Sequence, residues 1–251
     1  MTETSGEPMG QVRKQFHEEL DELQREIVRA AAMVTETIPR GTEVLLDSDL
    51  EGAQALIDND DELDLLSLEI EELAVRVLTL QQPMASDLRA VVTALKMNGE
   101  IERSGDLVVN IAKGARRIYG VQFNPRTRGI IEQMSEEAVR LTRFAIDAYV
   151  ERNASLAGAL DDMDDRLDGL NKEFVRVIFE AHNDGEITLQ AAVQLALVGR
   201  YYERIGDHAV NVGGMVQYMV TGWMPEHTGA ARARARHEGT IDRSPGDQVS
   251  E

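Results

Sequence analysis

The amino-acid sequence predicts an all-α protein of two tandem three-helix bundles, with six long helices related by a pseudo-twofold internal repeat. Runs of Val, Ile, Thr and Tyr that would indicate strands are scarce, and aromatic residues make up only 4% of the 251 residues. Segments rich in Leu, Ala, Glu, Arg and Met recur instead, and these residues favour helix. One nine-residue motif also occurs twice, 101 residues apart. We therefore expect two similar helical halves, at residues 11–120 and 124–222.

The first helix is expected to follow residues 1–10, which are rich in Gly, Pro, Ser and Thr and are predicted to be disordered. From residue 12, apolar side chains recur every three or four positions as far as Ile38, which is the pattern of an amphipathic helix. Pro39 removes a backbone hydrogen bond, so the helix either continues past it with a kink or ends there. The sequence leaves both possibilities open.

The second and third helices complete the first half. Residues 47–49 offer capping side chains ahead of Leu50, and apolar residues at helical spacing continue to about Leu80. Pro83 fits the first position of the third helix, because the N–H that proline lacks has no partner there, and this helix is expected to end near Tyr119. The first copy of the motif therefore lies inside a long helix.

The second half repeats this plan. Residues 120–125 form the junction between the halves, followed by a fourth helix over about residues 127–151 and a fifth over about residues 153–182. Thr188 caps a sixth helix, which carries the second copy of the motif and ends near residue 222. The helical pattern then stops, and residues 225–251 are predicted to be a flexible tail with a short basic run, Arg232, Arg234 and Arg236.

Composition excludes several classes of site and partner. The chain has no cysteine, which rules out disulfides and thiolate metal sites. No stretch approaches the ~20 apolar residues of a membrane span, and the N-terminus lacks the pattern of a signal peptide, so a cytoplasmic location is expected. The formal net charge of −19 disfavours nucleic acid and anionic lipid as partners. Basic protein surfaces and bound cations suit it better.

The repeated motif reads E-R-x-G-D-x-x-V-N at residues 102–110 and again at residues 203–211. Its two carboxylates are four residues apart, so they emerge from one helical face, and the Asn lies one turn further on. The positions are Glu102, Asp106 and Asn110, then Glu203, Asp207 and Asn211. Like charges at this spacing cost a few tenths of a kcal/mol on an exposed helix. A sequence that repeats them calls for a compensating cation.

A second acidic pair precedes each motif on the helix before it. Asp60 and Asp64 in the first half correspond to Asp164 and Asp168 in the second, 104 residues later. These pairs could face the motif carboxylates across each bundle. Four or more converging oxygens would suit Mg²⁺, Mn²⁺ or iron, so divalent or trivalent metal ions (Mg, Mn, Fe or Zn) are the predicted cofactors.

The alternative is that the pairs bind no metal. They could form an ion-pair network with arginines, or simply a solvated face; the candidate arginines are Arg89, Arg103, Arg200 and Arg204. The motif glycines, Gly105 and Gly206, are compatible with both interpretations. Glycine inside a helix costs ~1 kcal/mol relative to alanine, so its repetition indicates close approach of another helix, of a bridging ligand, or of a bulky side chain.

These residues resemble the PhoU family of phosphate-signalling regulators. The resemblance is carried by residues 82–89, which read QPMASDLR, together with both copies of the motif, and it covers about residues 12–222. It implies a non-enzymatic cytoplasmic regulator that represses the phosphate-starvation response and modulates phosphate uptake. The implied partners are the ATPase of the phosphate ABC transporter and the phosphate-sensing histidine kinase. A homodimer that reaches the membrane only through these partners is also implied.

The resemblance also ranks the candidate residues. Several family members bind multinuclear metal clusters through the motif. The resemblance therefore implies Glu102, Asp106, Glu203 and Asp207 as first-rank ligands, and Asp60, Asp64, Asp164, Asp168, Asn110 and Asn211 as second-rank ligands. Asp87 and Arg89 are candidates for partner binding, and their counterparts in the second half are Thr188 and Gln190, so the halves would differ there. Arg103 and Arg204 are further candidates for partner binding.

Two other functions compete with this interpretation. Carboxylates on a helical bundle can hold the metal pair of a ferritin-like oxidoreductase, but such sites use Glu-x-x-His, and none of the five histidines follows an acidic residue at that spacing. A metal-free helical scaffold would need only a solvated acidic face. No phosphate-binding G-x-x-x-x-G-K-[ST] loop and no Ser/His/Asp or Cys/His constellation is visible.

Overall fold

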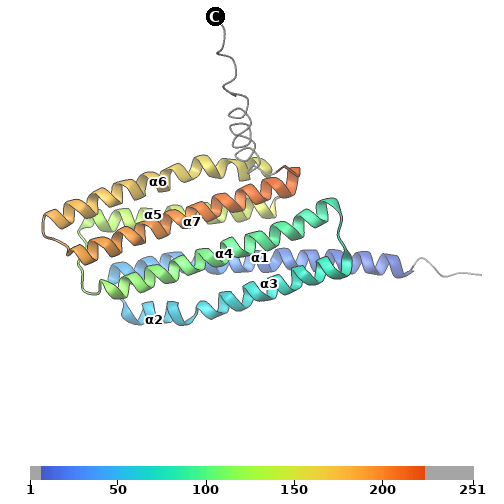
Figure 1. Cartoon of the computed structure of the whole chain (residues 1–251), viewed down its shortest axis with the longest axis horizontal. Coiled ribbons are helices and arrows are strands. Elements are labelled where there is room, and N and C mark those ends of the chain that lie inside the picture. The colour runs from blue at the N-terminus through green and yellow to red at the C-terminus, as the bar shows by residue number, and fades with distance from the viewer. Residues whose placement is uncertain (1–6, 224–251) are drawn as a thin grey trace, which may run out of the picture.

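The computed structural model describes residues 7–223, and within that range the chain forms seven α-helices and no strand. Their bounds are α1 (Glu7–Asp47), α2 (Leu50–Asp58), α3 (Asp60–Gln81), α4 (Ala85–Arg117), α5 (Pro125–Val150), α6 (Ala154–Asn183) and α7 (Leu189–Thr221). Figure 1 shows them as one elongated array, with α4 and α7 in the middle and α3 and α6 at opposite edges. The all-α fold with two three-helix units is confirmed.

The second predicted helix is divided, which makes seven helices instead of six. Asn59 ends α2, where its N–H donates to the Ala55 carbonyl, and it also precedes the first residue of α3. Three acidic residues follow it, at positions 60–62. Carboxylates stabilise a helix N-terminus, because the unpaired N–H groups there carry partial positive charge. The chain therefore restarts a helix at Asp60, one of the candidate ligands.

The first helix runs through Pro39 without ending, which decides the question that the sequence left open. Pro39 itself is exposed, whereas Ile38 and Thr42 beside it are buried. Helix α1 packs against α3 and α4 of its own half and against α5 of the other, and these contacts support its continuation past Pro39. The helix also begins at Glu7, ahead of the expected start, and the predicted tail at residues 225–251 lies outside the described residues.

Most predicted N-terminal caps are present, but the predicted start of α4 is wrong. Thr188 accepts from the Ala191 N–H, and Asp49 accepts from the Gly52 N–H. Pro83 does not begin α4, because the helix starts at Ala85 and the extended Met84 precedes it. The same helix ends at Arg117, slightly before the expected Tyr119.

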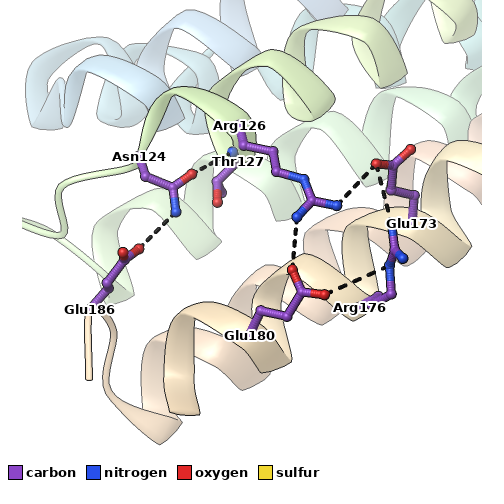
Figure 2. Close-up of polar contacts among 7 residues, drawn as sticks. All are labelled: Asn124, Arg126, Thr127, Glu173, Arg176, Glu180 and Glu186. Atoms are coloured by element: carbon purple, nitrogen blue, oxygen red, sulfur yellow. Dashed lines mark hydrogen bonds and ion pairs between the residues drawn. The ribbon is translucent and has the colours of Figure 1, made fainter. Parts of the chain in front are cut away.

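A surface network ties α5 to α6 (Figure 2). Asn124 caps α5 by accepting from the Thr127 N–H at 2.8 Å, and its amide donates to Glu186 at 2.7 Å. Arg126 contacts Glu180 at 2.8 Å and Glu173 at 3.4 Å, and Arg176 on α6 lies within 4 Å of both carboxylates. Exposed pairs of this kind stabilise little. They do neutralise the acidic groups on this part of α6.

A buried polar contact joins the two halves inside the core. Tyr202 of α7 is completely buried, and its Oη lies 2.7 Å from the Thr42 Oγ1 of α1. Thr42 Oγ1 is also 2.7 Å from the Ser135 Oγ of α5. Burial raises the pKa of Tyr202, so the phenol stays neutral and its hydrogen bond is preserved. The halves are thus packed as one unit around α1, α5 and α7.

Candidate metal centre

The first acidic cluster lies between α3 and α4. Asp60 and Asp64 come from the first turns of α3, and Glu102 and Asp106 come from the middle of α4. Burial raises the pKa of Asp60, and the neighbouring charges of Asp64 and Asp106 raise it further. Burial likewise raises the pKa of Glu102, with Asp106 and Asp64 adding to the shift. The fold therefore brings the four predicted carboxylates within electrostatic reach of one another.

The second cluster lies between α6 and α7 at the corresponding place. Burial, followed by the charges of Asp168 and Asp207, raises the pKa of Asp164 to about 6. The Oδ1 atom of Asp164 is buried and has no hydrogen-bond partner among the described residues. An unpaired buried oxygen of this kind costs free energy that a cation would offset.

The motif glycines seat side chains of the preceding helix. A Cβ at position 206 would lie 2.8 Å from Leu167 Cδ2 and would collide with Asp164 Oδ1. A Cβ at position 105 would collide with Leu63, the counterpart of Leu167. Glycine is required because the helices approach closely here. Asp164 occupies the space that a side chain at position 206 would fill. Helix packing and the position of this candidate ligand therefore both depend on Gly206.

The two clusters differ in their cations. Arg200 forms an ion pair with Glu203, and its Nη2 lies 3.9 Å from Asp207 Oδ2. The counterpart of Arg200 in the first half is Gly99, which has no side chain. No carboxylate of the first cluster makes an ion pair with any other residue in the range 7–223. The first cluster therefore has no ion-paired carboxylate within that range, whereas Arg200 and Lys172 pair with three of the four carboxylates of the second.

The clusters fit a hard cation in chemistry, although their side chains are not gathered around one point. Across residues 7–223, no three His, Asp or Glu side chains are already arranged to hold a metal. Each cluster nevertheless presents four carboxylates and no nitrogen or sulfur ligand, which is the donor set that Mg²⁺, Mn²⁺ and iron prefer. The raised pKa values and the unpaired Asp164 oxygen show where a cation would relieve repulsion.

The two predicted asparagine ligands are in different surroundings. Asn211 donates from Nδ2 to Glu100 Oε2 at 2.9 Å, so its amide is directed across the α4–α7 interface. Asn110 is half-buried on α4, and no hydrogen bond of its side chain to another described residue is present. The structure thus gives Asn211 a partner other than the carboxylates of its own cluster.

A buried link that the sequence did not reveal joins the two motif helices. Glu100 is 7% exposed, and its Oε2 lies 2.6 Å from His208 Nδ1. Arg103 donates to the other oxygen of Glu100 at 2.6 Å. Burial opposes the charge, but the hydrogen bonds from His208 and Asn211 outweigh it and lower the pKa of Glu100. The only signal in the sequence is that the motif carries Leu107 in one copy and His208 in the other.

The predicted partner-binding residues are divided between structural contacts and free surface. Arg89 donates from Nε to the Met219 carbonyl at 3.2 Å, near the C-terminus of α7, where a positive charge is favourable. Arg103 is bound to Glu100. Asp87 is half-buried, and Arg204 is exposed. Arg103 is exposed as well, but of these two arginines only Arg204 makes no ion pair with another residue in the range 7–223.

Comparison with known proteins identifies the family of this fold. The family model described as "PhoU domain" matches residues 27–115 and 131–216, one match in each half. The phosphate-specific transport system accessory protein PhoU homolog 1 of Mycobacterium leprae is 33% identical over 216 residues, which are 86% of this chain and 96% of that protein. PhoU homolog 2 of Mycobacterium tuberculosis is 33% identical over 215 residues, covering 85% of this chain and all of that protein.

A solved structure of the same family has the same fold. The crystal structure of PhoU from Pseudomonas aeruginosa superposes with a TM-score of 0.77 at 26% identity, and the match covers 83% of this chain and 100% of that one. No helix within residues 7–223 is both long and apolar enough to cross a membrane.

Proposed function

Because the chain belongs to the PhoU family of phosphate-transport regulators, we propose that it represses the phosphate-starvation response and restrains phosphate uptake when phosphate is plentiful. The proposal rests on one observation: both halves match the PhoU domain, and the match spans nearly the whole length of relatives named as accessory proteins of the phosphate-specific transport system. The protein acts by binding, without catalysis. Its partners are the ATPase of the phosphate ABC transporter and the sensor histidine kinase.

Deletion of the gene tests this function directly. In phosphate-rich medium, the deletion should switch on phosphate-starvation genes and raise phosphate uptake, and the wild-type gene supplied in trans should reverse both effects. Silent starvation genes together with unchanged uptake in the deletion strain would refute the proposal. Fractionation of the same cells tests the proposed cytoplasmic location, with membrane association expected only when the transporter is present.

We further propose that the two acidic clusters bind divalent or trivalent cations. Glu102, Asp106, Asp60 and Asp64 would hold the ion of the first cluster, and Glu203, Asp207, Asp164 and Asp168 that of the second. A bound cation supplies positive charge that neutralises the repelling carboxylates and fixes the helices in each half. The first cluster should bind more tightly, because in the second the cation must compete with Arg200 for Glu203 and Asp207.

Titration of the metal-free protein with Mn²⁺ tests this assignment. Glu102→Ala/Asp106→Ala should remove the tighter class of sites and leave the weaker one, and Glu203→Ala/Asp207→Ala should do the reverse. Elemental analysis of gently purified protein should find metal in the wild type and less in each variant. Equal Mn²⁺ binding by the wild type and both variants would instead support the metal-free scaffold. Sedimentation of the same samples measures whether the protein is the proposed homodimer.

A further inference from the structure

Helix α3 presents an apolar stripe directly to solvent. Leu65, Leu68 and Val75 are 61%, 52% and 55% exposed. They lie on the side of the helix opposite its buried residues, which include Leu66, Ile70, Leu73 and Val77. Figure 1 shows α3 at the outer edge of the helical array, with no other helix of residues 7–223 beyond it. We call this surface the α3 outer face, and it includes the exposed carboxylates Asp61, Glu69, Glu71 and Glu72.

The fold does not require leucine at these positions. Helix α6 occupies the equivalent edge of the second half, and there the counterparts of Leu65 and Leu68 are Gly169 and Lys172. Lys172 lies near Asp168 as part of a polar surface. Since the second half folds in the same way with these residues, the α3 leucines do not serve packing within the chain. Several exposed apolar residues grouped on one face without a packing role indicate contact with another molecule, whereas a single one does not.

The charges of the two edges differ in the same way. On α6, Glu173 and Glu180 are both paired with Arg126 and Arg176 (Figure 2). On α3, the counterparts of Glu173 and Arg176 are Glu69 and Glu72. Neither of these carboxylates, nor Asp61 or Glu71, has an ion pair with any residue between 7 and 223. The acidic charge of the α3 outer face is therefore left for a partner to neutralise.

We propose that the α3 outer face docks a basic amphipathic helix of a partner protein. An apolar stripe about three turns long along one helix matches the apolar face of a second helix packed beside it. The partner needs Lys or Arg on and beside its own stripe, because Glu72 lies within the stripe on α3 and the charged residues beside it are carboxylates and Arg76. A second copy of this chain fits poorly, since it would bring two strongly acidic helices together. The inference rests on the proposed function only in assigning the partner to the phosphate system.

Binding of a synthetic helical peptide to the full-length protein tests the surface. The probe carries Leu along one face and Lys on both flanks; a second peptide has Gln in place of every Leu, and a third has Glu in place of every Lys. Only the first should bind well. Leu65→Gln/Leu68→Lys should weaken its binding at least about tenfold, because central apolar contacts dominate interface energy. Leu68→Lys copies the α6 residue at an exposed position, so the fold is retained, and urea unfolding of the variant checks this.

The matched control is Phe179→Gln, which removes an exposed apolar side chain, 62% exposed, from the other edge. Peptide binding should be unchanged. Equal affinity of the wild type and the Leu65→Gln/Leu68→Lys variant, or equal binding of the Gln-substituted peptide, would overturn the proposal. A dimer that dissociates on the same α3 substitutions would make a second copy the occupant. Much tighter peptide binding after Arg232→Gln/Arg234→Gln/Arg236→Gln would make the chain's own C-terminal segment the occupant, and both results overturn a partner helix.

Complementation of the deletion strain separates this inference from the proposed function. If the deletion derepresses starvation genes and the α3 variant fails to restore repression, both stand. If the α3 variant restores repression fully, the docking surface is wrong and the function stands. If the deletion itself has no effect, the function is wrong, while the peptide measurement still decides the surface.

Discussion

The motif glycine on α7 gives a test of how closely the helices pack around the second cluster. In Gly206→Ala, the new Cβ would collide with Asp164 Oδ1 and would lie 2.8 Å from Leu167 Cδ2 and 3.3 Å from Leu141 Cδ1. Both leucines are completely buried, so they have little room to move. Gly214 on the same helix is the matched control, because a Cβ there meets nothing within 4 Å.

The expected magnitude follows from comparing the two variants. Each gains the same ~1 kcal/mol of helix propensity when alanine replaces glycine, so this contribution cancels in the difference. Overpacking a close-packed core costs ~1–3 kcal/mol, and only Gly206→Ala incurs it. Because the crowded atoms are the ends of side chains, the lower half of that range is expected. Gly206→Ala should therefore be about 1–2 kcal/mol less stable than Gly214→Ala.

Urea-induced unfolding of the full-length variants, without added metal, measures this difference. The same displacement of Asp164 should weaken Mn²⁺ binding at the second cluster and leave the first cluster unchanged. If Gly206→Ala proves as stable as Gly214→Ala, the close approach of α6 and α7 at this point is wrong. If stability falls but Mn²⁺ binding at the second cluster is unaffected, Asp164 is not a ligand.

Three further outcomes are expected. In the metal-free protein, the pKa of Asp164 is about 6 in the folded state against 3.8 ordinarily. Its charge therefore destabilises the fold above pH 6 and not below about pH 4. In urea titrations, Asp164→Asn should be more stable than the wild type at pH 7, by roughly 1 kcal/mol for a half-exposed group, and should lose that gain at pH 4. Glu100→Ala should lose about 2–3 kcal/mol, because it leaves His208 and Asn211 without their acceptor, whereas Glu102→Ala on the same helix should lose much less in the same assay. Arg200→Gln should raise Mn²⁺ affinity at the second cluster, measured by calorimetry, by removing the competing cation.

Helix type and order were predictable because they depend on local periodicity. Residues such as Leu23, Ile27 and Val34 recur at helical spacing and are all buried. The division at Asn59 was missed because apolar spacing continues across it, from Leu56 to Leu63 and Leu66, and neither glycine nor proline marks the break. Passage of α1 through Pro39 depends on contacts with α3, α4 and α5, which no local pattern contains.

The acidic clusters were likewise visible because each pair lies within one helical turn. The link from Glu100 to His208 was not, because 108 residues separate its members and each alone is an ordinary helical residue. The hydrogen bond of Arg89 could not be predicted for the same reason, since its acceptor is the carbonyl of Met219, 130 residues away. Predicting contacts between the halves requires the relative placement of α4 and α7. The internal repeat indicates only that the halves are related by an approximate symmetry.

The differences between the halves explain how one repeated fold supplies two kinds of surface. Positions that seat one helix on the next are alike in both halves, as in Gly105 with Leu63 and Gly206 with Leu167. Positions that face solvent or the other half differ, as in Gly99 against Arg200 and Leu68 against Lys172. Packing constrains only the positions that seat one helix on the next. The positions that face solvent or the other half can therefore change without loss of the fold. The half whose acidic cluster has no ion-paired carboxylate in the range 7–223 is also the half that exposes an apolar edge beside unpaired carboxylates. Cation binding and partner binding are therefore both expected to depend most on residues 60–106.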